Sequence, residues 1–354
     1  MLLTENQKIL IIGYGYIGSA LYESLKLDIR LNITILDDNY DNKENNFLNK
    51  SIEEFEKYYN FDIIILTAGQ SSIKDSDNLD LVIHNNITNF SLILSKLNSH
   101  QKFIYMSSAS VYGNTNGEIV NEMYSLKSPF NYYDMSKQTI DNIINIINNN
   151  ITNIDPQIFG LRLGSVNGVS PKMRNDIIIN SMVNDGLKGN LKIINQKKNK
   201  AILGINDLTC AVHKIIYLGN RSNSGIYNLN SFNNSVGEIG ETVRFMLSIK
   251  NVKIDSNEIH KDYDFKMTSK KFCDTFDFKF NDSLKSIISE LIELKYKIVD
   301  FCKICKTKAA LLILLDLGKY KMTKDSFPLK VMLCENCYHI QLNTVVNNWK
   351  IITK

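Results

Sequence analysis

The feature that most constrains the fold is a glycine-rich segment close to the start of the chain. The apolar run Ile9–Ile12 leads directly into Gly13-Tyr-Gly15-Tyr-Ile-Gly18, and an apolar, helix-like stretch follows. In such a strand–turn–helix, Gly13 allows the tight turn, Gly15 lets the backbone approach a pyrophosphate, and Gly18 permits close packing of the helix. The first N–H groups of the helix then face the phosphates. We therefore expect a dinucleotide-binding site.

An acidic residue indicates which dinucleotide is bound. Asp37 lies nineteen residues beyond Gly18, directly after the expected second strand, Asn32–Leu36. A carboxylate at this position accepts hydrogen bonds from both ribose hydroxyls and repels a 2′-phosphate. A glycine turn and a surface acid without function are the alternative, but the strand, the helix and the acid occur in the required order. The motif thus predicts NAD rather than NADP.

Five apolar runs alternate with helix-like stretches through the first 165 residues. Strands separated by helices predict right-handed βαβ units and a parallel sheet. The expected fold class is therefore α/β, with a Rossmann-type doubly wound parallel sheet. The runs are Lys8–Ile12, Asn32–Leu36, Asp62–Thr67, Lys102–Ser107 and Gln157–Leu163.

The pattern becomes irregular after the nucleotide part, which we place at about residues 1–165. Short strands among helices predict a smaller α/β substrate lobe over about 166–297. The expected elements of this lobe are two strands, Leu191–Ile194 and Gly225–Leu229, and four helices, Asp176–Asn184, Ile205–Leu218, Val236–Ser248 and Leu284–Tyr296.

A second group of residues indicates chemistry on an alcohol. The strand at Lys102–Ser107 is followed by Ser108, and Tyr133 and Lys137 are four residues apart, on one helix face. A free tyrosine has a pKa of about 10 and is a poor base at neutral pH, but an adjacent ammonium favours the phenolate. Tyr133 could then move the proton of an alcohol while hydride leaves its carbon for the cofactor. Ser108 could bind the same oxygen, and Lys137 the nicotinamide ribose.

These residues resemble the motifs of a known family. Ser107-Ser-Ala-Ser-Val-Tyr-Gly113, Tyr133-Asp-Met-Ser-Lys137 and His84-Asn85-Asn86 are similar to segments of the extended short-chain dehydrogenase/reductases, the NAD-dependent epimerase/dehydratase family. The resemblance covers roughly residues 8–290 and implies a nucleotide-sugar substrate and a homodimer formed through a helix pair. It also implies catalytic roles for Ser108, Tyr133 and Lys137, a place near the cofactor for Asn86, pyrophosphate contacts from the backbone of Tyr16 and Ile17, and a place beside the nicotinamide for Ala68.

The substrate side departs from the family pattern. Ser165 stands where the family commonly has Asn, and Lys200 where members often have an Arg that faces the phosphates. Arg174 and Asn180 lie in a segment that resembles the substrate lobe, where they could bind the diphosphate. An ordinary amphipathic helix explains these two residues about as well, so the identity of the sugar is left open.

Two residues narrow the choice of reaction. The 4,6-dehydratases of the family carry an Asp-Glu pair directly after the catalytic hydroxyl, where this chain has Ala109 and Ser110, which cannot eliminate water in that way. We expect an NAD-dependent nucleotide-sugar epimerase that works through a keto sugar. The alternatives are an NAD(P)H-dependent keto-sugar reductase and a non-catalytic nucleotide-binding scaffold for a sugar methyltransferase. The complete set of Ser, Tyr and Lys counts against the scaffold.

Two CxxC pairs, Cys302/Cys305 and Cys334/Cys337, set residues 298–354 apart from the domain over 1–297. Each pair can present two thiolates to one tetrahedral Zn²⁺, which predicts a closed, structural metal site. A module of this size with little core needs a metal to fold. The segment also resembles the zinc-binding domain that opens sugar C-methyltransferases, which implies a context in deoxy-sugar metabolism and a sugar methyltransferase partner.

Composition excludes several other classes of protein. The chain has 41 Lys plus Arg against 37 Asp plus Glu, and a net charge of +4 is too small to favour a nucleic-acid partner. Its strongest apolar run, Ala309–Leu315, is far shorter than the ~20 residues of a membrane-spanning helix. The polar start, Met1–Lys8, does not resemble a secretory signal. We therefore expect a cytoplasmic protein whose CxxC pairs bind metal rather than form disulfides.

Overall fold

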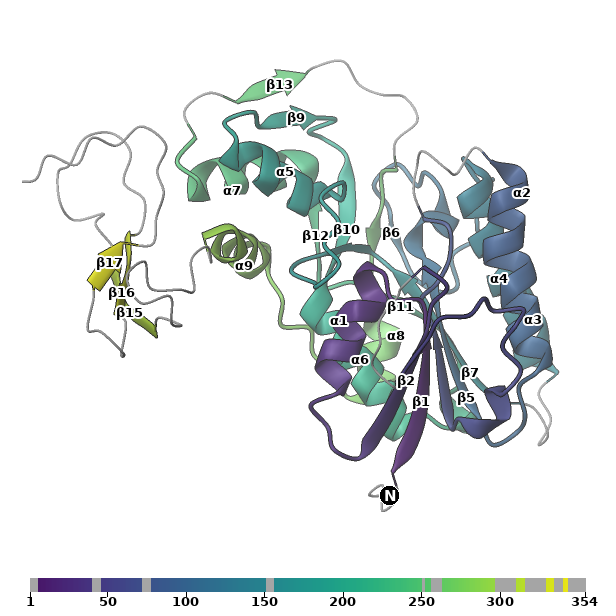
Figure 1. Cartoon of the computed structure of the whole chain (residues 1–354). Coiled ribbons are helices and arrows are strands. Elements are labelled where there is room, and N and C mark those ends of the chain that lie inside the picture. Colours follow the sequence, from purple (N-terminus) through teal and green to yellow (C-terminus); the bar gives the residue numbers. More distant parts are fainter. Residues whose placement is uncertain are drawn as a thin grey trace, which may run out of the picture.

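A computed structural model describes most of the chain (Figure 1). The described residues are 6–39, 46–71, 78–150, 156–249, 252–255, 263–296, 310–315, 329–333 and 340–342. The predicted zinc ligands Cys302, Cys305, Cys334 and Cys337 lie outside them. Within the described ranges, His, Cys, Asp and Glu side chains form no group of three or more that could hold a metal ion.

The large sheet has seven parallel strands in the spatial order β11-β7-β5-β4-β1-β2-β3. From β1 the chain extends the sheet through β2 and β3 in one direction, and then through β4, β5, β7 and β11 in the other. This is the doubly wound order of dinucleotide-binding folds, as predicted. The strands are β1 Gln7–Ile12, β2 Leu31–Leu36, β3 Phe47–Leu48, β4 Ile63–Leu66, β5 Lys102–Ser108, β7 Gln157–Leu163 and β11 Gly225–Leu229.

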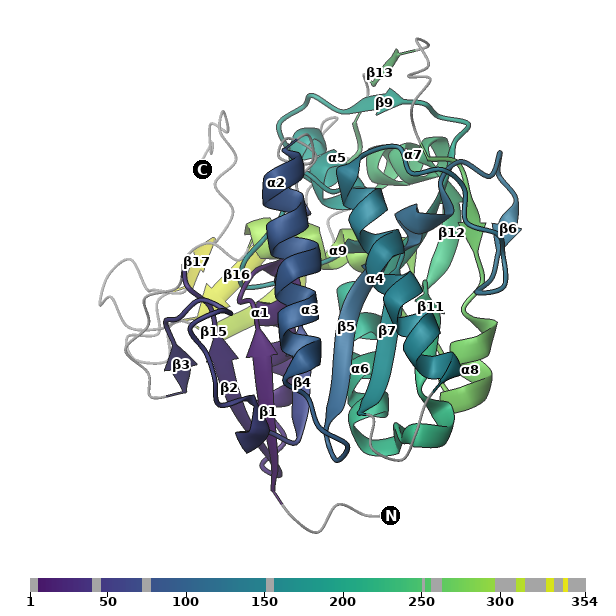
Figure 2. The ribbon, with the colours of Figure 1, turned by 90° about the vertical axis from the view of Figure 1, so that its right-hand side faces the viewer.

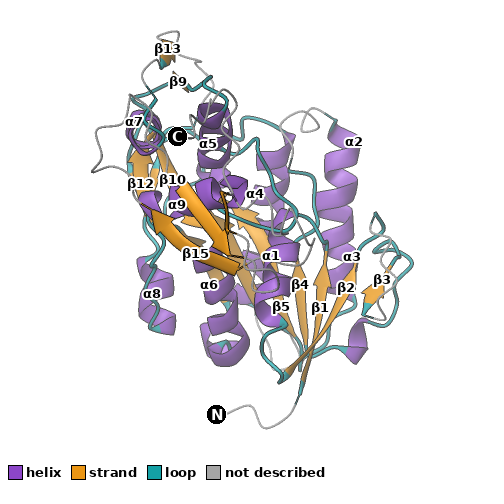
Figure 3. Cartoon of the chain, turned by 60° about the vertical axis from the view of Figure 1, so that its left-hand side comes forward, coloured by secondary structure: helices purple, strands orange, loops and turns teal. Residues whose placement is uncertain are grey.

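Helices cover both faces of this sheet (Figures 2 and 3). Helices α1, α6 and α8 pack on one face, and α2, the π-helical segment η2, α3 and α4 run along the other. These helices are α1 Tyr16–Leu25, α2 Leu79–Val82, η2 Ile83–Thr88, α3 Asn89–Ser95, α4 Tyr132–Asn149, α6 Ile205–Leu218 and α8 Lys270–Phe276.

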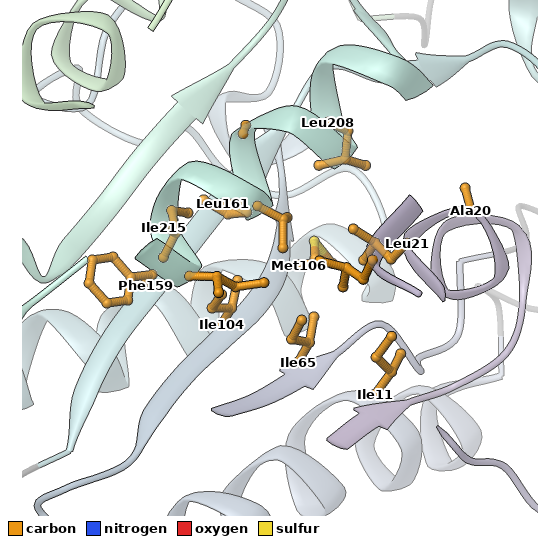
Figure 4. Packing of buried hydrophobic residues seen from close by; sticks show 14 of the residues in the cluster. Ile11, Ala20, Leu21, Ile65, Ile104, Met106, Phe159, Leu161, Leu208 and Ile215 are labelled. Carbon is orange, nitrogen blue, oxygen red and sulfur yellow. The ribbon is translucent and has the colours of Figure 1, made fainter. Parts of the chain in front are cut away.

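The strands are buried on both faces, so successive side chains enter two different cores. Ile9 and Ile11 of β1 pack in the core under α1 and α6, whereas Leu10 and Ile12 pack in the core under α3 and α4. Figure 4 shows the first core, in which Ile11 lies beside residues of the neighbouring strands and of α1 and α6. This double burial explains why the strands read as continuous apolar runs rather than as alternating ones.

A smaller lobe lies beyond the carboxyl edge of the large sheet (Figure 1). Its core joins α5, α7 and α9 with strands of two small sheets. The chain crosses between the two parts, because α6, β11 and α8 follow residue 165 in the sequence but pack in or on the large sheet. The lobe elements are β8 Ser165–Asn167, α5 Ile178–Leu187, β9 Lys192–Ile194, β10 Asn199–Gly204, β12 Phe232–Ser235, α7 Val236–Met246, β13 Lys253–Asp255 and α9 Leu284–Tyr296.

Most predicted elements are present with small shifts of their ends. The helices at Ile205–Leu218 and Leu284–Tyr296 have the predicted bounds. Strands β3, β8, β10 and β12 were not predicted, because they are short and polar or follow one another too closely for a clear pattern. None of the described helices is long and apolar enough to cross a membrane. The remaining short elements are β6 Ile119–Val120, β14 Lys266–Met267, β15 Ala310–Leu315, β16 Leu329–Leu333, β17 Ile340–Leu342, η1 Tyr58–Asn60, η3 Ala109–Tyr112 and η4 Arg221–Asn223.

Candidate active site

A cavity of about 410 Å³ opens where the order of strands reverses, between β1 and β4. This reversal is the usual ligand position in open α/β sheets, because the connections leave the two strands in opposite directions. The cavity collects residues that are far apart in the sequence. Eight predicted site residues line it: Gly13, Gly15, Tyr16, Ile17, Gly18, Asp37, Ala68 and Arg174.

The glycine loop has the geometry that its motif predicts. Gly13 has a φ of +98°, which residues with a side chain rarely adopt. A Cβ on Gly18 would lie 1.9 Å from the carbonyl oxygen of Gly13, so only glycine allows α1 to pack this closely. A Cβ on Gly15 would meet no atom within 4 Å and would occupy open space at the cavity. The loop therefore leaves room for a pyrophosphate at the start of α1, which fits NAD.

Asp37 lies at the end of β2, on the cavity wall. Its Oδ2 accepts a hydrogen bond from the Tyr14 backbone N–H at 2.6 Å, and its Oδ1 accepts one from the Asn39 backbone N–H at 2.9 Å. These bonds hold the carboxylate in place without using all its acceptor positions, so it can also accept from ribose hydroxyls. This acceptor therefore fits a cofactor without a 2′-phosphate.

Further residues at this end of the cavity escaped prediction from the sequence. They come from the loops after β2 and β3 and from the helical segment that follows β4, and only His84 and Asn85 belong to a motif noted in the sequence. The signal of the others is their position after the second, third and fourth strands of a dinucleotide-binding sheet. They are Asp38, Asn39, Lys50, Ser51, Ile52, Glu53, His84, Asn85 and Asn89.

Asn86 lies beside the cavity rather than in its wall. Its side chain is buried: Oδ1 accepts from the Gln70 backbone N–H at 2.7 Å, and Nδ2 donates to the Gln70 carbonyl oxygen at 3.1 Å and to Ser136 Oγ at 2.9 Å. Asn86 thus fixes the loop after β4 against α4. Its predicted place near the cofactor is compatible with this supporting position.

The three predicted catalytic residues come from one strand end and one helix. Ser108 is the last residue of β5, and its Oγ lies 2.9 Å from Ser110 Oγ. Tyr133 and Lys137 lie in the first two turns of α4, which Asn131 caps by accepting from the Asp134 backbone N–H. Nζ of Lys137 donates to the Met106 carbonyl oxygen on β5 at 2.8 Å. This bond holds the lysine close to the strand that carries Ser108.

Burial shifts the pKa values of Tyr133 and Lys137. It raises the pKa of Tyr133, while a hydrogen bond with Ser108 lowers that pKa. Of the charges that act on Tyr133, Asp134 raises its pKa and Arg174 lowers it. Burial lowers the pKa of Lys137 to about 8, against the nearby negative charge of Asp141. Arg174 is thus the cation that favours the phenolate in this structure, and the same role for Lys137 stays a prediction.

The two predicted substrate residues differ in exposure. Arg174 lines the cavity, donates from Nη1 to Ser71 Oγ at 3.1 Å, and pairs with Asp176 at 2.6 Å. Asn180 is 2% exposed, and its Nδ2 donates to the Arg174 carbonyl oxygen at 2.8 Å while its Oδ1 accepts from the Gly168 backbone N–H at 3.0 Å. Asn180 therefore supports the loop that carries Arg174, and its predicted contact with the diphosphate remains untested.

Solved structures with the same fold extend over most of the chain. The UDP-glucuronic acid 4-epimerase from Bacillus cereus, in complex with UDP-glucuronic acid and NAD, is 19% identical, with a TM-score of 0.71 over 81% of this chain and 99% of its own. The ADP-L-glycero-D-manno-heptose-6-epimerase of Helicobacter pylori is 23% identical, with a TM-score of 0.71 over 83% and 98%. An NAD-dependent NDP-hexosamine 5,6-dehydratase involved in tunicamycin biosynthesis is 18% identical, with a TM-score of 0.69 over 83% and 99%.

Comparison with the sequences of curated proteins found no match. At identities below 25%, the likeness to these solved structures establishes the fold alone. A family model reaches further, because that of the "NAD dependent epimerase/dehydratase family" matches residues 9–229, which is more than half of the chain. The protein therefore belongs to the NAD-dependent epimerase/dehydratase family.

Proposed function

We propose that the protein is an NAD-dependent nucleotide-sugar epimerase that oxidises its substrate to a keto sugar and reduces it again on the other face. One observation carries this proposal: Ser108, Tyr133 and Lys137 meet at the end of β5. The neighbouring strand, β4, leads into a loop that lines a cavity with the features of an NAD site. Membership of the family and NAD-bound structures with the same fold support the same class of reaction.

In this proposal Tyr133 acts first as a base and then as an acid. It takes the proton of a sugar hydroxyl, Ser108 donates a hydrogen bond to the same oxygen, and Lys137 stabilises the phenolate. NAD, when bound, supplies the redox chemistry by taking up the hydride and giving it back. Once the keto sugar presents its other face, hydride returns to that face and Tyr133 returns the proton to the sugar oxygen. No cofactor is therefore consumed.

The diphosphate of the substrate is the part that Arg174 is suited to bind. Its guanidinium lines the cavity and can form two parallel hydrogen bonds to phosphate oxygens. Solved structures with this fold contain UDP-glucuronic acid and UDP-glucose, which supports a nucleoside diphosphate sugar here as well. Ala109 is buried and Ser110 lies against Ser108, so the positions that carry the acid and base of 4,6-dehydratases offer neither group.

The cofactor that remains on the purified protein tests the reaction type. The full chain is purified without added cofactor and denatured, and the released nucleotide is identified by chromatography. Near-stoichiometric NAD is expected from a cofactor that is recycled in place. An empty protein that consumes NADH or NADPH with a keto sugar would identify the reductase instead.

Turnover by the wild type and by Tyr133→Phe tests the assignment of the site. A panel of UDP-, dTDP- and ADP-sugars is incubated with each protein, and new epimers are detected by proton NMR. The variant should lose turnover while it keeps the affinity of the wild type for NAD. Full activity of Tyr133→Phe would refute the assignment.

The zinc module remains part of the proposal. We expect one structural Zn²⁺ bound by Cys302, Cys305, Cys334 and Cys337, because four thiolates saturate a tetrahedral site. Zinc analysis of the full chain should give one equivalent, which the double variant Cys302→Ser/Cys334→Ser should lose. Deleting residues 298–354 should abolish association with a sugar methyltransferase but spare turnover. Size-exclusion chromatography of the same proteins tests the proposed homodimer.

A further inference from the structure

A loop of the substrate lobe lies against the first turn of α1. It covers residues 168–174, follows β8, and ends at Arg174, which lines the cavity. Helix α1 begins at Tyr16, directly after the glycine loop. The two segments are more than 150 residues apart in the sequence, yet buried hydrogen bonds join them. The loop that carries the proposed diphosphate ligand is therefore attached to the turn that fits a pyrophosphate.

The Tyr16 side chain holds the start of this loop. Its hydroxyl is buried and donates to the Gly168 carbonyl oxygen at 2.8 Å. Nδ2 of Asn180 lies 3.4 Å from the same hydroxyl oxygen and 3.3 Å from the same carbonyl oxygen. It also donates to the Arg174 carbonyl oxygen at 2.8 Å, at the end of the loop. Tyr16 and Asn180 thus form one buried group that fixes both ends of the loop.

Two buried serines hold the middle of the loop. Oγ of Ser170 donates to the Tyr16 carbonyl oxygen at 2.6 Å and lies 2.9 Å from Oγ of Ser19 on α1. The Lys172 backbone N–H donates to the same Ser19 oxygen at 3.3 Å. Ser19 is 0% exposed and Ser170 is 4% exposed, so water does not compete for these bonds. The loop is therefore fixed along its whole length.

The guanidinium of Arg174 depends on this attachment for its place in the cavity. It pairs with Asp176 and donates to Ser71 Oγ, in the loop after β4, at 3.1 Å. Its side chain thus reaches from the substrate lobe to the nucleotide part of the molecule. Binding of a phosphate by a guanidinium depends closely on geometry, so a small displacement of the backbone that carries it weakens the contact.

On the basis of the proposed function, we propose that Tyr16 and Ser170 are positioning residues that place Arg174 at the diphosphate of the nucleotide sugar. Each hydroxyl donates its proton to a backbone carbonyl oxygen, so neither has a proton left for the substrate. Both therefore act through the loop that ends at Arg174. The first turn of α1 then fixes the spacing between the pyrophosphate of NAD and the diphosphate of the substrate.

Nucleoside diphosphates serve as probes of this placement. The full chain is saturated with NAD and titrated by calorimetry with UDP, dTDP and ADP, and the tightest binder of the three is used for all variants. Tyr16→Phe keeps the ring but removes its hydroxyl, and Ser170→Ala removes the second hydroxyl. Each variant should lose about 10-fold in affinity for the probe, because a buried carbonyl oxygen loses its donor and the loop shifts. Affinity for NAD should fall less than affinity for the probe.

A double-mutant cycle separates positioning from a general loss of structure. Arg174→Gln should lower the affinity for the probe by about 10-fold or more. Adding Tyr16→Phe or Ser170→Ala should then change it by less than about 2-fold, because the guanidinium that they place is gone. Tyr227→Phe is the matched control, since it removes a hydroxyl that also donates to a backbone carbonyl oxygen, that of Asn223, but lies in the edge strand β11. It should keep both affinities of the wild type.

Each outcome decides the inference. Unchanged affinity for the probe in both folded variants, additive losses in the cycle, or an equal loss in the control would each overturn it and leave the proposed function intact. A wild type that binds none of the three probes would refute the proposed function and this inference with it. Melting temperatures show whether the variants fold, and Ser170→Ala carries the test if Tyr16→Phe does not.

Discussion

Nζ of Lys137 lies 5.7 Å from the centroid of the Tyr133 ring, one helical turn away on the same face of α4. The ammonium is buried and donates to the Met106 carbonyl oxygen. Burial therefore lowers its pKa to about 8, although Asp141 opposes this change. An ammonium in this state is buried at a cost to stability.

Replacing Lys137 by Met should separate catalysis from stability. Turnover should fall by about 10²-fold or more, because Lys137 is the residue proposed to stabilise the phenolate. The folded-state pKa lies below the ordinary value of 10.5, so the cost of burying the charge is fully present below pH 8 and disappears between about pH 8 and 10.5. The wild type should thus gain on the order of 3 kcal/mol of unfolding free energy relative to the variant over this range. Urea unfolding of both proteins at several pH values measures the gain. The same pH dependence of the unfolding free energy in both proteins would contradict it.

The buried pair of Asp141 and Arg162 should contribute far more to folding than an exposed pair does. Asp141 Oδ2 lies 2.7 Å from Arg162 Nε, and both side chains are at most 4% exposed. Asp141→Asn leaves the guanidinium buried without its counter-charge and should cost about 3–5 kcal/mol of unfolding free energy. Asp274→Asn is the control, because it breaks an exposed pair with Lys270 and should cost under about 1 kcal/mol. Equal costs by urea unfolding would show that burial of the first pair does not matter.

Two alanine substitutions in the glycine loop should affect different properties, one the stability of the fold and the other the binding of NAD. In Gly18→Ala the new methyl group would lie 1.9 Å from the Gly13 carbonyl oxygen, so the melting temperature should fall although alanine favours helices. In Gly15→Ala the methyl group enters open space, so the melting temperature should hold while NAD binding weakens. Thermal unfolding and calorimetric NAD titration distinguish the two. Normal NAD affinity in Gly15→Ala would place the pyrophosphate elsewhere.

Asp37→Ser should weaken NAD binding and relax the discrimination against NADP. The carboxylate is oriented by the backbone N–H groups of Tyr14 and Asn39, so the substitution removes a prepared acceptor for the ribose. Hydrogen bonds to a charged group contribute about 1.5–3 kcal/mol, which corresponds to a loss of about 10- to 100-fold in affinity. Dissociation constants for NAD and NADP measure both effects. Asp38→Ser, at the neighbouring position on the cavity wall, shows whether the effect is specific to Asp37.

Local patterns in the sequence were sufficient for the parts of the site that depend on few neighbouring residues. The turn at Gly13, the close packing at Gly18 and the acid at the end of β2 follow from rules that act within one βαβ unit. The same holds for Tyr133 and Lys137, whose spacing on a helix decides that they share a face. These residues could be predicted because their geometry is determined by adjacent backbone.

The direction and charge of other side chains depend on contacts between distant segments. Asn180 has the sequence position of a substrate ligand, but its amide is used by the backbone of Gly168 and Arg174. No spacing rule links Tyr263 to Asp134, 129 residues earlier, or indicates that Arg174 acts on Tyr133.

The sequence by itself thus determined the class of fold, most strands of the large sheet and the residues at the strand ends, because periodicity and turn chemistry are local. Only the tertiary structure decided which of these residues face the cavity and which support it from behind. It also decided the directions in which the pKa values of Tyr133, Asp134 and Lys137 shift, since loss of water and the approach of distant charges arise only when the chain is packed.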